Sequence, residues 1–196
     1  MNKPLAPKTK RGQARRLTIL NAAEQVIGQQ GFSAATIADI TRAADTALGT
    51  FYVYFSSKEE IFRELVLEMG RATRAKIAFA TETAPDRIAA ERAGLETFLR
   101  FVAERPSLYR VVEEARFVDP KAYRSYFNGF GDAYAKGLRA AAEKGEISQG
   151  DAEVRAWALM GMVKALGDRY VLWDDNPDID WVVDEAHRLI THGLAP

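Results

Sequence analysis

A segment of the sequence between Thr46 and Lys58 gathers side chains that can bind an anion. It contains Thr50, Tyr52 and Tyr54, and the lysine follows them. Hydroxyl groups donate hydrogen bonds to phosphate oxygens, and an ammonium group adds a point charge. Phosphate recognition is therefore the chemistry that these residues favour.

Catalysis and metal binding have weaker candidates. Glu113 and Glu114 are adjacent, so on a helix their carboxylates diverge by roughly 100° and do not pair across a substrate. His187 and His192 miss the i, i+4 spacing of two helical metal ligands. The chain has no cysteine, which excludes disulfides, thiolate zinc sites and cysteine nucleophiles and suits a reducing cytoplasm. We expect a cytoplasmic protein that is not an enzyme and has no cofactor and no metal site.

The net charge of zero conceals an asymmetry along the chain. Residues 1–58 hold eight Lys and Arg against three Asp and Glu, a net charge of +5, and the remainder holds nineteen against twenty-four, a net charge of −5. This distribution favours an amino-terminal part that binds a polyanion, although a solubilising tail would give the same asymmetry. No apolar run reaches the roughly 18 residues of a membrane span. The charged start of the chain also lacks the apolar segment of a secretory signal, so we expect no membrane association.

Most of the chain has the periodicity of helices. Apolar residues recur at intervals of three and four, and the alternation typical of strands is missing. Gly31 predicts the end of the first helix, and Ser56 and Ser57 followed by Glu59 and Glu60 predict a capping box at the start of a long one. We therefore predict an all-α protein of about nine helices: 12–30, two short helices beginning near Thr36 and near Thr46 or Ala47, 57–79, 86–104, 107–117, 120–144, 150–172 and 178–193.

The two short helices form a helix-turn-helix, whose second helix can enter a DNA major groove about 12 Å wide. A helical hairpin of these lengths is also common as plain packing. The residues here, however, resemble the TetR/AcrR family of bacterial transcriptional regulators from Ile19 to Leu65. The matching positions are Thr36, Ile40, Ala44, Gly49, Thr50, Tyr52, Tyr54, Phe55, Ser57, Lys58 and Glu59.

The resemblance implies that the second short helix lies in the major groove and that Thr36 and Lys58 hold phosphates. Helix N-termini present free N–H groups to an anion, which agrees with these roles. Gly49 lets the backbone approach DNA closely. The predicted DNA-binding residues are Thr36, Thr46, Ala47, Leu48, Gly49, Thr50, Tyr52, Tyr54 and Lys58.

The turn departs from the family pattern. Asp45 replaces the usual Gly and tolerates a left-handed backbone, Thr46 replaces Val and can cap the helix, and Ala47 replaces Ser and loses a phosphate contact. No Arg, Lys, Asn or Gln lies between Ala43 and Ser57. We therefore predict recognition through thymine methyl groups, hydroxyl groups and DNA shape.

Leu48 has two interpretations. Helical spacing groups it with Phe51 and Phe55 in a core stripe, whereas the family position directs it toward the groove. We favour the groove for Leu48 and expect the two phenylalanines to anchor the helix in the core.

The resemblance also implies a small-molecule effector bound in the larger domain. An aromatic stripe from Tyr123 to Tyr134 could line its site or be simple core, and Glu113 could be solvated or face the ligand. The stripe favours a hydrophobic effector such as an aromatic or acyl compound. The predicted effector-binding residues are Phe98, Phe101, Tyr109, Glu113, Phe117, Tyr126, Phe127 and Phe130.

The last two helices are predicted to form a dimer interface, since in the family such helices make a four-helix bundle. Two reading heads on a two-fold axis imply a palindromic operator. The alternative is that these residues belong to the core of one chain. The predicted interface residues are Trp157, Met160, Val163, Leu166, Trp181, Val182, Ala186, Leu189 and Ile190.

The sequence thus predicts a homodimeric repressor that a hydrophobic effector releases from double-stranded DNA. Its predicted parts are a basic arm (1–11), a helix-turn-helix domain (12–58) and an effector-binding and dimerisation domain (59–196). The arm could contact phosphates or the minor groove, or only solubilise the protein. The alternative function is a helical small-molecule-binding or scaffold protein without DNA binding.

Overall fold

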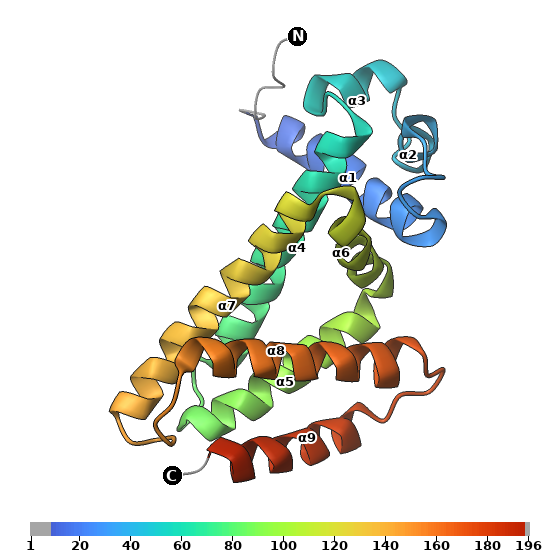
Figure 1. Ribbon diagram of the computed structural model, residues 1–196. Helices are drawn as coiled ribbons and strands as arrows, with labels where there is room; N and C mark the ends of the chain where they lie inside the picture. The colour runs from blue at the N-terminus through green and yellow to red at the C-terminus, as the bar shows by residue number, and fades with distance from the viewer. Residues whose placement is uncertain (1–8, 195–196) are drawn as a thin grey trace. The chain divides into compact units, whose positions relative to one another are not determined.

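The computed structural model describes residues 9–194 and confirms the all-α fold with nine α-helices in that range. The predicted arm lies almost wholly outside the described residues. None of the described helices is long and apolar enough to cross a membrane. The helices in Figure 1 are α1 (Lys10–Gln30), α2 (Ile37–Ala43), α3 (Leu48–Tyr54), α4 (Lys58–Thr81), α5 (Arg87–Glu104), α6 (Pro106–Val118), α7 (Pro120–Glu143), α8 (Ala152–Gly167) and α9 (Ile179–Leu194).

Short-range signals place the helix ends. Gly31 ends α1 with a φ of 80°, a conformation open to a residue without Cβ. At the start of α4 the N–H of Glu60 donates to Ser57 Oγ at 3.1 Å, which confirms the predicted serine cap. The Glu60 carboxylate accepts from the N–H and hydroxyl of Ser56 rather than from Ser57.

The chain divides into two compact units. The first unit comprises residues 9–69 and 106–126, and the second comprises 70–105 and 127–194. Helices α4 and α7 each contribute to both units. The predicted functional boundary at residue 58 is a different division, and it stays a prediction.

In the first unit, α1 packs against both α2 and α6. The core is aromatic and aliphatic, and Ile19, Ile40 and Phe62 are fully buried in it. Gly28 permits the close approach of α1 to α6, because a Cβ there would lie 2.5 Å from the Cβ of Ser107. Through α1, this packing connects α2 of the helix-turn-helix to α6.

In the second unit, α5 contacts both α8 and α9 (Figure 1). Leu99, Val102 and Val183 are buried in its core, and a second cluster around Leu138 and Leu159 joins α7 to α8. The helix predicted over 150–172 widens into a π-helix over its last turn, Asp168–Leu172. The periodicity of apolar residues did not indicate this change.

Candidate nucleic-acid interface

The turn between α2 and α3 depends on one unusual backbone conformation. Asp45 has a φ of 46°, in the left-handed region, which confirms the expectation for this residue. The N–H of Asp45 donates to Arg42 O at 3.2 Å, and the N–H of Thr46 donates to Thr41 O at 3.0 Å. These bonds close the end of α2 and start the turn into α3.

The inner face of α3 is held by Phe51 and Phe55. Both side chains are 0% exposed, and their ring centroids lie 5.7 Å apart. Burying rings of this size contributes about 1.5–3 kcal/mol each. The expectation that these two residues anchor the helix is confirmed.

The outer face of α3 is apolar and open. Leu48 is 52% exposed, Tyr52 51% and Val53 61%, and a Cβ placed on Gly49 would meet no heavy atom of the described residues within 4 Å, apart from its chain neighbours and the backbone of α3. These positions follow i, i+1, i+4 and i+5, which form one helical face opposite Phe51. Leu48 therefore lies outside the core, as we favoured from the sequence.

Val53 was missing from the predicted DNA-binding set. Once Phe51 is assigned to the core, the i, i+4 and i+5 positions from Leu48 would have placed Val53 on the outer face. The expectation that Thr46 caps α3 was wrong. The N-cap is Ala47, whose methyl group accepts no hydrogen bond. Thr46, Thr50 and Tyr54 are partly exposed.

Thr36 is engaged at the N-terminus of α2. Its hydroxyl donates to Asp39 Oδ2 at 2.6 Å and accepts from the Asp39 N–H at 3.1 Å. The hydrogen bond from the Thr36 side chain is the largest factor that lowers the pKa of the Asp39 carboxyl. A phosphate bound by Thr36 would have to displace this carboxylate and tolerate its negative charge.

Lys58 is directed at the loop that precedes α2. Its Nζ lies 2.6 Å from Phe32 O, 2.7 Å from Ala35 O and 4.3 Å from the centroid of the Phe32 ring. Two of its three N–H donors are therefore occupied. The lysine fixes the α1–α2 loop and keeps one donor for any phosphate.

The N–H of Phe32 is held from α6. Both carboxylate oxygens of Glu114 accept it, at 2.7 Å and 2.8 Å. The Phe32 ring meets the Phe62 ring edge to face, with centroids 4.9 Å apart. Sequence reasoning missed these contacts, because Phe32 and Glu114 are 82 positions apart and no short-range pattern joins them.

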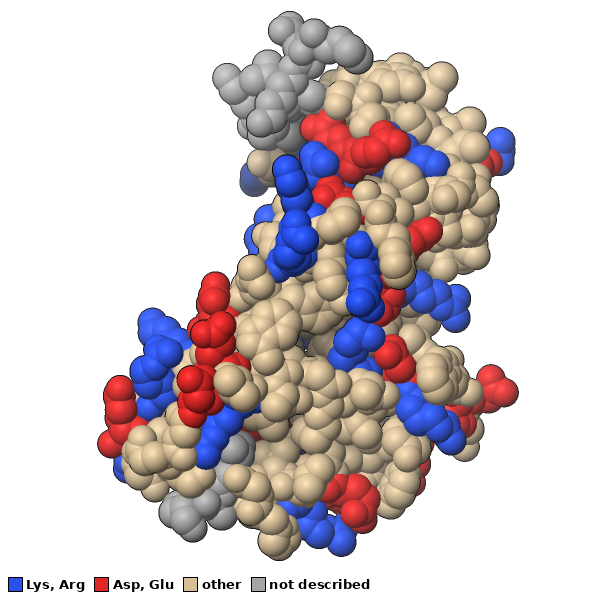
Figure 2. Space-filling model, in the orientation of Figure 1, with Lys and Arg blue, Asp and Glu red and all other residues tan. Residues whose placement is uncertain are grey.

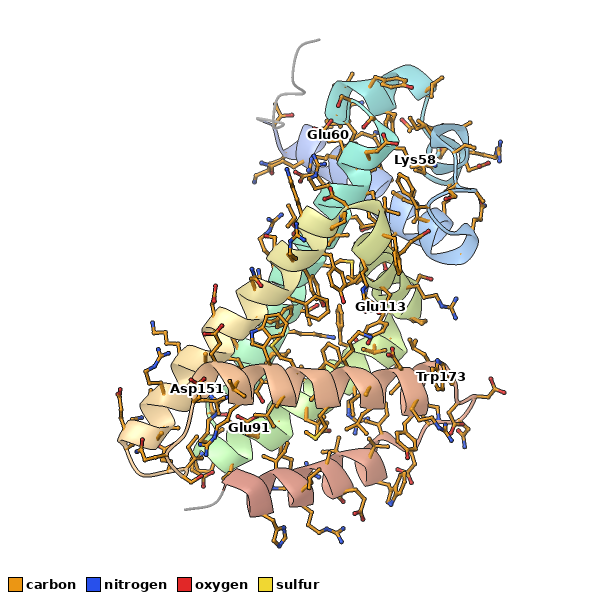
Figure 3. All side chains as sticks on the ribbon, in the orientation of Figure 1. Lys58, Glu60, Glu91, Glu113, Asp151 and Trp173 are labelled. Carbon is orange, nitrogen blue, oxygen red and sulfur yellow. The ribbon has the colours of Figure 1, made fainter. Side chains whose placement is uncertain are left out.

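An open hollow of about 420 Å³ lies in the first unit between this loop and the end of α3. Lys58, which Figure 3 labels at the start of α4, is one of its lining residues. Tyr52 belongs both to the hollow and to the exposed face of α3. The lining residues are Ser33, Ala35, Thr36, Ile37, Tyr52, Ser56, Ser57, Lys58 and Glu59.

Positive charge near this face comes from α1 rather than from α3. Lys10, Arg11 and Arg15 are exposed on the first turns of α1. Arg16 is bound to Glu64 at 2.7 Å. The face drawn in Figure 2 mixes acidic and basic side chains and shows no continuous basic stripe.

A family model described as "Bacterial regulatory proteins, tetR family" matches residues 19–65, the stretch that contains α2, the turn and α3. The chain belongs to the TetR family. The helix-turn-helix described above is therefore that of a TetR-family transcriptional regulator.

Related proteins agree with this assignment. The chain is 54% identical to the HTH-type transcriptional regulator YvdT of Bacillus subtilis over 43 residues, a match that spans 22% of either protein. It is 26% identical over 194 residues to the HTH-type transcriptional regulator YdgC of the same organism, covering 95% of each.

Solved structures share the fold. The fatty acid degradation regulator FadR from Bacillus halodurans superposes with a TM-score of 0.83 at 24% identity, covering 94% of this chain and 96% of that one. FadR from Bacillus subtilis, in complex with stearoyl-CoA, superposes with a TM-score of 0.81 at 20% identity, covering 89% and 96%. At these identities the likeness establishes the fold alone.

The predicted effector-binding residues of this TetR-family protein fall in both units. In the first unit Tyr109 and Tyr126 are buried, Glu113 is half-buried and Phe117 is 82% exposed. The second unit contains Phe98, Phe101, Phe127 and Phe130, of which Phe101 is buried and the others are half-buried. That these residues form one site stays a prediction.

The predicted dimer residues of the TetR-family protein divide by exposure. Val182, Ala186 and Ile190 are buried in the second unit, as in the alternative interpretation, and have little surface left for a partner. Trp157, Trp181 and Leu189 are exposed, whereas Met160, Val163 and Leu166 are half-buried. An interface would therefore depend on the exposed members of the set.

Proposed function

We propose that this TetR-family regulator is a homodimeric repressor that reads a palindromic operator with α3 and is released by a hydrophobic small molecule. The observation that carries the proposal is the outer face of α3. Leu48, Gly49, Tyr52 and Val53 are open to solvent on a helix that Phe51 and its neighbours anchor in the core. Such a face, exposed on a helix that is anchored in the core, suits entry into a major groove.

The mode of reading follows from the residue types of α3. Without Arg, Lys, Asn or Gln, the helix lacks the bidentate pairs that select guanine or adenine. The methyl groups of Leu48 and Val53 can contact the C5-methyl of thymine, and Gly49 allows close backbone approach. We therefore propose an operator that contains thymines where α3 meets it and that is selected further by its shape.

Phosphate binding would be shared between residues of α1 and α3. Lys10, Arg11 and Arg15 of α1 supply exposed charge, and the hydroxyl groups of Tyr52 and Tyr54 supply neutral donors. In this proposal Lys58 acts mainly by holding the α1–α2 loop, and Thr36 by capping α2.

Dimerisation would use the exposed apolar residues of α8 and α9. Trp157, Trp181 and Leu189 are large, and aromatic residues are enriched at protein interfaces. A two-fold axis between two chains would relate two copies of α3 and make the operator palindromic.

The proposed effector is an aromatic or acyl compound. The aromatic character of Phe98, Phe101, Phe127 and Phe130 supports this class. The complex of Bacillus subtilis FadR with stearoyl-CoA, a protein of the same fold, also supports an acyl effector.

A second candidate function is a helical ligand-binding protein without DNA binding. Two observations favour it: α3 carries no basic residue, and Thr36 and Lys58 are engaged within the chain. A salt titration on duplex DNA from upstream of the gene distinguishes the two functions. A repressor loses affinity steeply as salt rises, whereas the second candidate shows no saturable binding at any salt concentration.

A further inference from the structure

Arg74 of α4 has an unusual environment. The residue is half-buried in the second unit, and its Nη1 atom is buried without a hydrogen-bond partner among the described residues. No described carboxylate forms an ion pair with its guanidinium. A cationic nitrogen buried without a partner is costly, so this atom needs an explanation.

Helix α7 accommodates the guanidinium. A Cβ on Gly129 would lie 2.9 Å from Arg74 Nη1, so a side chain at this position would require the guanidinium to shift. The Cζ atom of Arg74 lies 5.1 Å from the centroid of the Phe130 ring, within range of a cation–π interaction. Gly129 thus leaves space for the guanidinium and the Phe130 ring lies beside it, but neither residue offers a negative charge.

The charges along α4 do not balance Arg74. Residues 70–81 contain Arg71, Arg74 and Lys76 and no acid. Lys76 is compensated, because its Nζ lies 2.6 Å from the carboxylate of Glu104. The neighbouring Thr73 is 0% exposed, and its Oγ1 is also buried without a partner among the described residues. Two consecutive side chains therefore present buried polar atoms that lack partners.

We infer that Arg74 binds an oxyanion on the effector, which makes the effector an amphipathic acid with a carboxylate or phosphate group on an apolar body. The inference rests on the proposed function, because it concerns the effector of that function. The guanidinium has the geometry to bind a carboxylate or a phosphate through two parallel N–H donors. Phe130, already among the predicted effector-binding residues, supplies an apolar surface beside it.

Ligands that differ only in charge test the inference. Decanoate, decyl phosphate and decanol share one chain, and 4-phenylbutyrate and 4-phenylbutanol provide an aromatic pair. In at least one of the two series, decyl or phenylbutyl, the acids should raise the Tm of the full chain and release DNA. They should bind about tenfold or more tightly than the alcohol of the same series. Comparison of decanoate with decyl phosphate distinguishes the two oxyanions.

Variants assign the effect to Arg74. Arg74→Met keeps the apolar contact with Phe130 and should abolish the preference for the acid, whereas Arg74→Lys should retain part of it. Lys76→Met is the matched control on the same helix and should keep the wild-type preference. Without ligand, Arg74→Met should not lower Tm, because it removes a cationic group with a buried nitrogen that has no partner among the described residues.

Each opposite result is informative. If alcohols and acids bind equally and release DNA, the inference that the effector is an acid is wrong, while the proposed function stands. If Arg74→Met keeps the wild-type preference, or Lys76→Met loses it to the same extent, the assignment to Arg74 is overturned. If Arg74→Met lowers Tm without ligand and keeps the preference, the arginine is structural. If no compound binds, both the inference and the proposed class of effector fail.

Discussion

Both polar backbone groups of Phe32 are bound by charged side chains: Lys58 donates to its carbonyl oxygen, and Glu114 accepts from its N–H. The ammonium lies 2.6 Å from the oxygen and the carboxylate 2.7 Å from the nitrogen. Two charged side chains from α4 and α6 thus fix the loop that leads into α2. The position of the helix-turn-helix depends on this loop.

Replacing Lys58 by Met tests whether the lysine acts on the loop or on DNA. Met keeps the apolar contact with the Phe32 ring but removes two charge-assisted hydrogen bonds. We expect the free energy of unfolding to fall by about 2 kcal/mol, with a lower Tm measured by calorimetry. The salt dependence of DNA binding should stay close to that of the wild type. A phosphate role would instead leave Tm unchanged and reduce the salt slope by about one for each chain.

Glu114→Gln should weaken the same loop from the other side. The amide retains one acceptor oxygen for the Phe32 N–H but loses the charge, so we expect a loss of about 1 kcal/mol in urea unfolding. Glu143→Gln on the exposed part of α7 is the control and should change stability by less than about 0.5 kcal/mol. Equal effects of the two substitutions would contradict a stabilising role of the Glu114 charge at the Phe32 N–H.

Leu48→Ala and Phe51→Ala separate the outer face of α3 from its inner face. The first removes an exposed side chain and should alter the operator preference at thymine positions with little change in Tm. The second creates a cavity at a fully buried position and should cost about 3–5 kcal/mol. A large drop in Tm for Leu48→Ala, with unaltered DNA binding, would show that Leu48 acts in the core rather than in the groove.

Asp119 predicts a loss of stability in acid. Burial raises the pKa of its carboxyl, but the N–H of Ala122 at 3.0 Å and the Arg63 guanidinium at 2.6 Å outweigh burial, so the net pKa is lowered. A lowered pKa gives stability that is present above the unfolded value of about 3.9 and is lost as the pH falls through the folded value. Asp119→Asn should therefore lower Tm at pH 7, and the difference from the wild type should shrink toward pH 3. A difference that is constant across this range would contradict the role of the ionised carboxylate.

Short-range signals predicted much of the fold and part of the candidate site. Gly31, the Ser57 cap and the left-handed Asp45 are each determined by neighbours in sequence, and the structure has them as expected. The burial of Phe51 and Phe55 also follows from helical periodicity.

Contacts between distant segments could not be predicted in the same way. Lys58 fits a phosphate role by its place in the motif, yet it turns to Phe32, 26 positions away, where two carbonyl oxygens are available. Val182 and Trp181 were both predicted at the dimer interface, but only packing within the second unit decides that Val182 is buried and Trp181 exposed. Arg74 gave no sequence signal, because its environment is created by α7.

The central claim is that the outer face of α3 reads duplex DNA. Its most direct test is fluorescence anisotropy on a labelled duplex from upstream of the gene and on a scrambled duplex, with wild type and a Leu48→Ala, Tyr52→Ala double variant at fixed salt. We predict that the wild type prefers the upstream duplex by about a thousandfold or more, and that the double variant loses most of this preference while keeping its Tm. Equal affinity of the wild type for both duplexes, or a double variant that discriminates as the wild type does, would contradict the claim.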